Sequence, residues 1–487
     1  MPASLLFTHS YFLAFDPKQQ VAMQPYPPLG TLYAMSVLRE AGNHVDLHDS
    51  MFQPGPEPLA QVLKLRQPRY LVLYDDGFNW LTKMCLSNMQ QAAFRMIELG
   101  KQQGCTVLVS SSDASDHREK YLNAGADFIL IGEAEFTLRE LIASLEDGLA
   151  PKDIPGLAYL EKGGLTLSPP RKPLRNLDQL PFPAWDVLDF SPYRDAWLRH
   201  HGFVSMNLVT TRGCPFKCNW CAKPIYGQRY NSHSPERIVA SIQKIREYWD
   251  VDHFWFSDDI FGLKPGWVAS FDALLQAEKL KIRYKIQSRA DLLLEENAIH
   301  HLASSGLETA WIGAESGSQK ILDAMEKGTT VDQIHTARQL LAHNGVRVGF
   351  FLQFGYLGET KADIQKTLDM VLELMPDEIG ISVSYPLPGT GFFEKVKAQL
   401  KTKTNWTDSD DLAMLYQGSF SSEYYRALHR YVHLRHRLKK CRQLLIAALK
   451  SPFSKTRPPL FKTLRESAGV IRLLQYWWKL RRLENST

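Results

Sequence analysis

Short apolar runs alternate with amphipathic segments along the first 150 residues. The apolar runs have the length and composition of buried strands, and they occupy 4–8, 44–48, 69–74, 106–110 and 127–131. The segments between them show helical spacing, and those at 31–41 and 89–103 each stop at a glycine. This alternation predicts a doubly wound, Rossmann-like parallel sheet.

A sheet of this kind binds its ligand in the loops at the carboxyl ends of its strands. Here those loops are 8–28, 75–80, 110–116 and 132–135. No Gly-x-Gly-x-x-Gly sequence follows the first strand, so a dinucleotide is disfavoured as the ligand.

The second half of the chain repeats the alternation after a break. Residues 151–202 are rich in proline and predict an irregular linker that lies over domain surfaces. Six further apolar runs then follow, at 203–208, 253–256, 284–287, 309–313, 347–351 and 378–383. The pattern therefore divides the chain into a first domain, a linker, a second domain and a helical C-terminal region, at 1–150, 151–202, 203–400 and 401–487.

Composition narrows the class of protein. Of the 487 residues, 44% are hydrophobic and 22% are charged, which is globular composition and excludes wholesale disorder. No run approaches about eighteen uncharged apolar residues, and no basic segment precedes the first apolar run. We therefore expect a cytoplasmic protein without a transmembrane helix or a signal peptide.

Charge is unevenly distributed along the chain. Residues 423–487 contain 16 Lys and Arg against 3 Asp and Glu, whereas the rest contains 41 against 49. A basic tail can meet nucleic acid, an anionic membrane surface or an anionic substrate, and it can equally be a solvated helical face.

Three of the six cysteines lie within eight residues, as Cys214, Cys218 and Cys221. Three thiolates on one loop can bind three irons of a 4Fe–4S cluster and leave the fourth iron open. An open iron can chelate S-adenosylmethionine (SAM), whose reductive cleavage releases a 5′-deoxyadenosyl radical. The spacing therefore indicates radical SAM chemistry, with these three cysteines as the catalytic metal ligands.

A zinc knuckle is the competing interpretation of the same cysteines. A structural zinc site requires four protein ligands, usually from paired Cys-x-x-Cys sequences. The other cysteines, Cys85, Cys105 and Cys441, are distant in the sequence, and the spacing of His233 does not recommend it as a fourth ligand.

The sequence at 212–224, Arg-Gly-Cys-Pro-Phe-Lys-Cys-Asn-Trp-Cys-Ala-Lys-Pro, resembles the radical SAM superfamily. Together with Gln-Pro-Tyr-Pro-Pro-Leu-Gly at 24–30 and Gly-Glu-Ala-Glu at 132–135, it resembles the subclass with an N-terminal cobalamin-binding domain. Within that subclass the chain is similar, over about residues 1–400, to the anaerobic magnesium-protoporphyrin IX monomethyl ester oxidative cyclase group. The resemblance implies a partial (β/α)6 TIM-type barrel for the second domain, and a 4Fe–4S cluster, SAM and cobalamin as cofactors.

The resemblance also implies SAM contacts at the carboxyl ends of the barrel strands. Ser257, Asp258 and Asp259 lie where the family contacts the methionyl amino group, and Arg289 suits the methionyl carboxylate. The other SAM candidates are Trp220, Glu315, Ser316, Pro386 and Gly389, and the substrate candidates are Gln353, Tyr356 and Tyr385. Taken singly, the acidic and serine residues are typical of helix N-caps.

In the first domain the cobalamin candidates are the strand-end residues Pro28, Leu29, Asp76, Ser110, Ser111, Ser112, Gly132, Glu133 and Glu135. Serines at 110–115 stand where the family often has a glycine-rich turn. Asp46 and His48 partly match a signature whose histidine ligates cobalt, but Met51 replaces its final glycine and the segment follows the second strand. We therefore expect cobalamin to bind without a histidine below cobalt.

The function that the resemblance implies is methylation or oxidative modification of an unactivated carbon on an apolar, tetrapyrrole-like or lipid-like substrate. Flavodoxin or ferredoxin would supply the electron. Two alternatives stay open: a radical SAM enzyme that modifies nucleic acid, which the basic tail permits but a missing second cysteine group disfavours, and a non-catalytic iron–sulfur or zinc module. The amphipathic segment 468–483, with Trp477 and Trp478 beside basic residues, suits an interfacial membrane helix or a helix packed on the barrel mouth.

Overall fold

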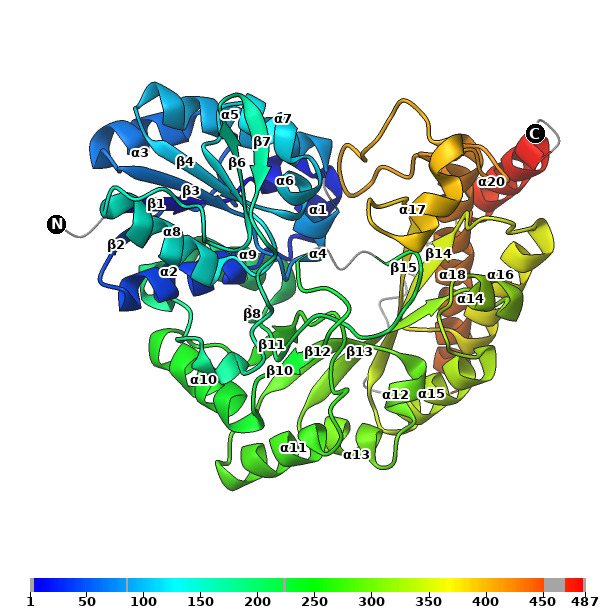
Figure 1. The fold of residues 1–487 in the computed structure, drawn as a ribbon. Helices are drawn as coiled ribbons and strands as arrows, with labels where there is room; N and C mark the ends of the chain where they lie inside the picture. Colours follow the sequence, from blue (N-terminus) through cyan, green and yellow to red (C-terminus); the bar gives the residue numbers. More distant parts are fainter. Residues whose placement is uncertain (1–3, 85, 222–224, 451–468, 485–487) are drawn as a thin grey trace.

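The computed structural model describes residues 4–84, 86–221, 225–450 and 469–484, so Cys85 and the end of the cysteine motif at 222–224 lie outside the described residues. Figure 1 shows two large sheets, one in each half of the chain, and a helical C-terminal region beside the second sheet. The predicted α/β class and its two successive sheets are confirmed.

The first sheet has the strand order β2-β1-β3-β4-β5-β6-β7. Its parallel part contains β1 (Ser4–Thr8), β2 (His44–Leu47), β3 (Tyr70–Tyr74), β4 (Thr106–Ser110) and β5 (Phe128–Leu130). All five residues of β3 are buried, as expected for a central strand with helices on both faces. One face is covered by α2 (Leu29–Glu40) and α8 (Glu135–Glu146), the other by α3 (Pro58–Arg66) and α5 (Ser87–Gln102). The strand order changes direction at β1, which creates the crevice between β1 and β3 where such sheets bind ligands.

Part of the segment expected to be an irregular linker is ordered structure. The strands β6 (Leu157–Glu161) and β7 (Gly164–Leu167) form an antiparallel hairpin that extends the first sheet, and α9 (Ser191–His201) is a helix. The hairpin turns at Lys162 and Gly163, whose φ angles of 51° and 81° are typical of a tight two-residue turn. The sequence signal was a glycine pair between two short apolar runs, which the surrounding prolines obscured.

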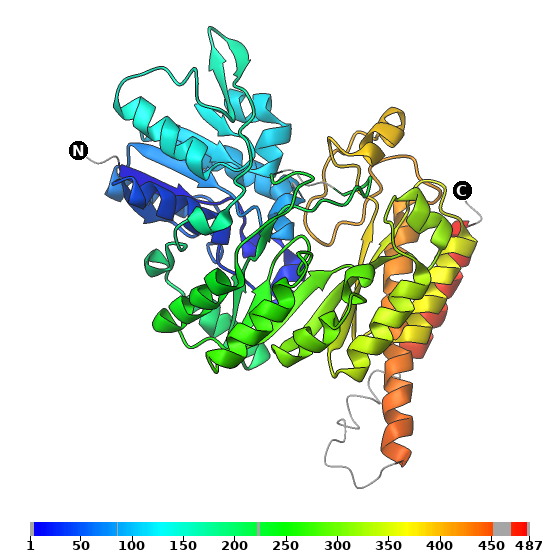
Figure 2. The ribbon, with the colours of Figure 1, turned by 60° about the horizontal axis from the view of Figure 1, so that its bottom comes forward.

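The second sheet is entirely parallel and has the strand order β15-β14-β13-β12-β11-β8. Its strands are β8 (Ser205–Leu208), β11 (His253–Phe256), β12 (Arg283–Ser288), β13 (Leu307–Glu315), β14 (Arg347–Phe354) and β15 (Glu378–Val383). Figure 2 shows the helices in a row along the outside of this sheet, and they include α10 (Pro235–Tyr248), α11 (Trp267–Ala277), α15 (Val331–His343) and α16 (Lys361–Leu374). The arrangement is the six-strand open barrel that the resemblance implied.

The C-terminal region packs on the outside of this barrel. Helix α18 (Ser422–Lys450) contacts α16 and β15, and α20 (Gly469–Glu484) lies along α18 (Figure 1). The alternative in which the last helix covers the barrel mouth is therefore wrong for α20. Among the described helices, none is long and apolar enough to cross a membrane.

The two domains are joined by a buried ion pair. Arg212, in the short strand β9 (Thr211–Arg212), donates to Glu135 Oε1 of the first domain across 2.7 Å, and its guanidinium lies 3.8 Å from Glu133 Oε2. Its side chain is only 1% exposed. Burying a charge of this kind is tolerated only when it is paired, so the ion pair fixes the first sheet against the strand that precedes Cys214.

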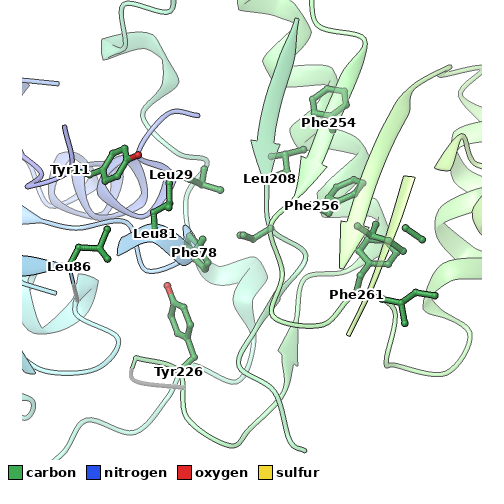
Figure 3. Close-up of a cluster of buried hydrophobic side chains, with 14 of the residues drawn as sticks. Tyr11, Leu29, Phe78, Leu81, Leu86, Leu208, Tyr226, Phe254, Phe256 and Phe261 are labelled. Atoms are coloured by element: carbon green, nitrogen blue, oxygen red, sulfur yellow. The ribbon is translucent and has the colours of Figure 1, made fainter. Parts of the chain in front are cut away.

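Aromatic rings complete the surroundings of this arginine. The guanidinium carbon lies 5.7, 5.5 and 5.2 Å from the ring centroids of Tyr33, Phe78 and Tyr226. The rings of Phe78, from the first domain, and Tyr226, from the second, are stacked with their centroids 5.2 Å apart. Figure 3 shows the two side chains next to each other in the cluster of buried hydrophobic side chains between the two domains. The rings exclude water from the ion pair and supply cation–π attraction.

Further contacts join the first domain to the second domain and to the C-terminal region. The loop that precedes α2 reaches the second sheet, where Tyr26 Oη lies 3.0 Å from Ser205 Oγ and the Tyr26 ring packs on Trp255. On the other side, Ser409 Oγ donates to Asp16 Oδ1 across 2.7 Å, and Ser87 N donates to the carbonyl of Trp406. The position of the first domain relative to the second sheet is thus fixed by these contacts as well as by the Arg212 ion pair.

The ion pair gives a stability prediction. Arg212→Met leaves Glu135 buried without its cation, so we expect it to lower the free energy of unfolding by about 3–5 kcal/mol. The matched control is Arg39→Met, because Arg39 pairs with Asp186 in solvent, with side chains 43% and 42% exposed, and should cost less than ~1 kcal/mol. Anaerobic denaturant titration of both variants checks this, and equal unfolding midpoints would contradict the role given to Arg212.

Candidate cofactor site

The cysteine loop leaves β9 through a glycine that no other residue could replace without strain. Gly213 has φ +80°, and a Cβ there would overlap the carbonyl oxygen of Arg229. Cys218 is buried, while Cys214 and Cys221 are half-buried, and none of the three forms a disulfide within the described residues. The loop therefore turns sharply and presents its thiols at the carboxyl edge of the second sheet.

Asn219 anchors the middle of the loop to the barrel. Its backbone N–H donates to the carbonyl of Met325 and its Nδ2 to that of Ala324, while its carbonyl accepts from Phe392 N–H. Tyr356 Oη donates to Asn219 Oδ1 across 2.7 Å and is also 2.9 Å from the Ala324 carbonyl. The structure thus uses Tyr356, a substrate candidate, to position the cysteine loop.

A positively charged side chain lies beside the buried thiol of Cys218. Arg289 Nη1 lies 3.9 Å from Cys218 Sγ, and the guanidinium stacks 3.7 Å from the ring centroid of Phe216. Arg289 also donates to the carbonyl of Lys327 and to the carboxylate of Asp291. Three thiols on one loop are the donor set of an iron–sulfur cluster, and a nearby guanidinium can offset the negative charge of such a cluster, so the donor set suits one.

Asp258, at the carboxyl end of β11, holds the chain just before the cysteines. It accepts hydrogen bonds from Thr210 N and Thr211 N, at 2.7 and 2.8 Å, and from Thr210 Oγ1 at 2.6 Å. Burial raises the pKa of Asp258 to about 7 despite these bonds. Of its neighbours, Ser257 is buried with Oγ 3.3 Å from the Leu208 carbonyl, and Asp259 is exposed.

The end of β13 contains strained backbone. Glu315 has φ +56°, unusual for a residue other than glycine, and its carboxylate accepts from Lys327 Nζ across 2.8 Å. Ser316 is fully buried, with Oγ 3.1 Å from Thr367 Oγ1. These two candidates therefore shape the turn, with Lys327 as a charged neighbour that the sequence did not single out.

Polar atoms without partners lie at the ends of neighbouring strands. Gln353 Oε1 on β14, Ser384 Oγ just after β15 and Trp220 Nε1 on the cysteine loop are buried and accept or donate no hydrogen bond within the described part of the chain. Unpartnered buried polar groups are rare, and they fit the binding of a polar small molecule here. In the turn that follows, Pro386 is buried, Gly389 is exposed with φ +76°, and Tyr385 packs edge-on against Trp406.

The loops at the switch point of the first sheet are also polar and buried. Ser10 donates to both oxygens of Asp75, and Asp76 Oδ1 accepts from Gly30 N and Phe78 N. Pro28 and Leu29 begin α2 at this point. A Cβ on Gly30 would come within 3.1 Å of Asp76 Oδ1, so the start of α2 and the end of β3 are in close contact.

The remaining cobalamin candidates divide into two groups. Ser110, Ser111 and Ser112 are buried at the end of β4, and Ser111 Oγ accepts from Ala114 N. Gly132 has φ +77° and leads into Glu133 and Glu135, whose carboxylates face Arg212. The glutamates thus belong to the contact between the domains.

The two histidines that the sequence analysis weighed as metal ligands, His48 and His233, lie in different parts of the structure. His48 follows the edge strand β2, and its buried Nε2 has no hydrogen-bond partner in the described structure, while burial lowers its pKa. His233 Nδ1 lies 2.9 Å from Asp178 Oδ1, in the interior of the protein. Across the described ranges, no three His, Cys, Asp or Glu side chains are grouped to hold a single metal ion.

Comparisons with known proteins place the cysteine loop in a family. Residues 208–371 match the family model of the Radical SAM superfamily. An uncharacterized methyltransferase of Pyrococcus horikoshii is 30% identical over 286 residues, 58% of this chain and 60% of that protein. The anaerobic magnesium-protoporphyrin IX monomethyl ester cyclase of Rubrivivax gelatinosus is 26% identical over 55% of this chain and 49% of its own length. The chain thus spans about half to three fifths of these relatives.

Solved structures share the fold of both domains. The cobalamin-dependent SAM radical enzyme OxsB, determined with aqua-cobalamin, superposes with a TM-score of 0.72 at 18% identity, over 98% of this chain and 72% of that one. The radical SAM methyltransferase TsrM from Kitasatospora setae, determined with cobalamin and a [4Fe-4S] cluster, gives a TM-score of 0.67 at 16% identity, over 82% and 75%.

Proposed function

Residues 208–371 form a radical SAM domain, and we propose that the whole chain is a cobalamin-dependent radical SAM enzyme. The observation that carries the proposal is the loop of Cys214, Cys218 and Cys221, held at the carboxyl edge of the second sheet and tied through Arg212 to the first. When bound, the cluster would supply the electron that cleaves SAM to methionine and a 5′-deoxyadenosyl radical, and cobalamin would supply a carrier for a methyl group or an electron.

In this proposal the three thiolates ligate three irons, and the cationic side chains of Arg289 and Lys327 offset the negative charge of the thiolate-ligated cluster. SAM is held at the strand ends near Gln353 Oε1, Ser384 Oγ and Trp220 Nε1, whose hydrogen-bonding capacity is unused. The other SAM candidates, Asp258 and Ser316 above all, act by fixing the loops that surround it.

We assign cobalamin to the first domain, residues 1–150, which the hairpin β6–β7 extends. Its corrin would lie over the switch point between β1 and β3, where Pro28, Asp76 and the serines at 110–112 line the carboxyl edge. The switch point lies inside the sheet, whereas His48 follows the edge strand β2. This supports cobalamin bound without a histidine below cobalt.

The substrate proposed is a largely apolar molecule, tetrapyrrole-like or lipid-like, which is methylated or oxidised at an unactivated carbon, with flavodoxin or ferredoxin as the electron donor. The names of the relatives support this range, since they include the Rubrivivax cyclase and the hopanoid C-3 methylase of Methylococcus capsulatus, which is 25% identical over 77% of this chain and 70% of its own length.

A peripheral membrane contact is a second proposal, based on the outer face of α20. Ile471, Leu474 and Trp478 are 68%, 55% and 67% exposed there, beside basic Arg472 and Arg482. Exposed aromatic and aliphatic groups next to basic side chains suit an anionic bilayer surface.

SAM cleavage tests the proposed function. The reconstituted, reduced protein is expected to convert SAM to methionine and 5′-deoxyadenosine, and Cys214→Ala, Cys218→Ala and Cys221→Ala should each lower the rate at least ~100-fold, because the cluster loses a ligand. The control Cys105→Ala, a buried thiol in the first domain, should retain the rate. Cleavage that survives the three substitutions, or stoichiometric zinc in place of iron, would sink the proposal.

The absorption spectrum of bound cobalamin tests the assignment of its lower face. His48→Ala is expected to leave that spectrum unchanged, because no protein nitrogen ligates cobalt in the proposed arrangement. A shift of the bands on substitution would identify His48 as the ligand.

Liposome co-sedimentation tests the membrane contact. Binding to anionic vesicles should fall at least ~10-fold in the variant Trp478→Ser, whose lost indole is exposed, and should fall as salt is added. Co-sedimentation that is unaffected by deleting residues 452–487 would refute the proposal.

A further inference from the structure

The C-terminal region also reaches the carboxyl end of β14. Gly355, the first residue after this strand, has φ +79°, and a Cβ there would come within 3.1 Å of the Met414 side chain and 3.2 Å of the Tyr425 ring. Tyr416 Oη donates a hydrogen bond to the carbonyl oxygen of Gly355. All three of these C-terminal side chains are buried. The backbone at Gly355 is therefore enclosed by residues from outside the barrel.

A buried carboxyl group closes the turn that begins at Gly355, and residues 355–359 are called the β14 turn below. Glu359 is 1% exposed, its Oε2 accepts from Gly355 N across 2.6 Å, and its backbone N–H donates to the carbonyl of Tyr356. Burial raises the pKa of Glu359 to about 8. Of the charged side chains that also act on it, Asp363 raises the pKa and Lys320 lowers it, and these two pair with each other across 3.3 Å. At pH 7 the carboxyl group is therefore largely neutral.

The presence of an acid here is not explained by packing alone. Glu359 Oε1 is buried without a hydrogen-bond partner in the described part of the chain, and leaving a polar atom in this state is unfavourable. An apolar side chain of similar size would avoid that penalty. What the carboxyl group adds is an acceptor for the N–H of Gly355, which fixes the backbone of the β14 turn.

The β14 turn contains the side chain that contacts the cysteine loop. Tyr356 Oη donates to Asn219 Oδ1 across 2.7 Å, and Asn219 directly follows Cys218. The Tyr356 ring stacks on Phe392 with centroids 4.9 Å apart, and the ring of Tyr416 packs edge-on against the other partner of this pair, Phe392, at 5.3 Å. A displacement of the β14 turn would therefore move a hydrogen-bond donor away from the residue next to Cys218.

We propose that Glu359 and Tyr416 are positioning residues for the iron–sulfur cluster. They hold the β14 turn, and the turn holds the cysteine loop through Tyr356 and Asn219. The inference rests on the proposed function, because it takes the cysteine loop to bind the cluster, and it goes beyond that function by giving the C-terminal region a role at the cluster. Glu359 acts as a neutral acceptor, so glutamine can replace it and leucine cannot.

The test uses the full chain with its reconstituted cluster under anaerobic conditions. Two properties are measured: the rate at which an iron chelator removes the cluster, and the EPR spectrum of the reduced cluster with and without SAM. We expect Tyr416→Phe and Glu359→Leu each to raise the rate of iron release about 10-fold and to change the EPR spectrum, because each loses a hydrogen bond that holds the turn. Glu359→Gln should release iron within about 2-fold of the wild-type rate and keep the wild-type spectrum, because its amide oxygen still accepts from Gly355 N.

Tyr284→Phe is the matched control. Tyr284 is a fully buried tyrosine of the same barrel, its Oη lies 2.7 Å from Ser305 Oγ, and it is located near the amino end of β12, away from the cysteine loop. Its variant should match the wild type in iron release and in EPR spectrum. If Glu359→Leu fails to fold, Tyr416→Phe keeps the inference testable, because it removes a single hydroxyl group.

A double substitution tests whether the residues act in series. Tyr416→Phe added to Tyr356→Phe should raise the rate of iron release little beyond Tyr356→Phe alone, whereas independent effects would multiply. The inference is overturned by multiplying effects, by Glu359→Leu and Tyr416→Phe that release iron like Tyr284→Phe, or by Glu359→Gln that releases iron as fast as Glu359→Leu. A wild-type chain that binds no iron–sulfur cluster overturns the proposed function, whereas a stable cluster that none of the substitutions affects overturns only this inference.

Discussion

The pairing of Arg212 with Glu135 is the constraint on which the arrangement of this molecule depends. A fully buried guanidinium must keep its carboxylate, and the two groups come from different domains, since Glu135 begins α8 and Arg212 lies in β9. Because Arg212 precedes Cys214 by only two residues, the position of the cysteine loop cannot change without disturbing the first domain. The stacked rings of Phe78 and Tyr226 keep water out of the same contact. One ion pair thus fixes the position of the cysteine loop relative to the first domain, to which cobalamin is assigned in the proposed function.

The polar residues around the cysteine loop fall into two groups with different roles. The side chains of Asp258, Ser316 and Tyr356 form hydrogen bonds within the protein, and these bonds hold the loops at the ends of β11, β13 and β14 respectively. By contrast, Gln353 Oε1 and Ser384 Oγ are buried and have no hydrogen-bond partner within the described residues. The site is therefore built from an outer set of groups that fix the backbone and a smaller set that is free to meet a ligand, as preorganised sites require.

Much of this was predictable from the sequence. Apolar runs located every parallel strand of the two main sheets, and the cysteine spacing located the loop, because these features depend on local periodicity and on covalent spacing. The hairpin β6–β7 and helix α9 were missed because prolines around them suggested irregular chain. The pairing of Arg212 with Glu135, 77 residues away, and the contact of Lys327 with Glu315 could not be predicted, since each depends on which segments become neighbours in the fold.

The central claim is that one chain holds two cofactors at facing sheet edges, and metal analysis tests it most directly. The protein would be reconstituted anaerobically with iron, sulfide and hydroxocobalamin, freed of excess by gel filtration, and assayed for metals and absorption. The account predicts about four irons and one cobalt per chain. Iron without cobalt would contradict the role of the first domain, and zinc with neither would contradict the account as a whole.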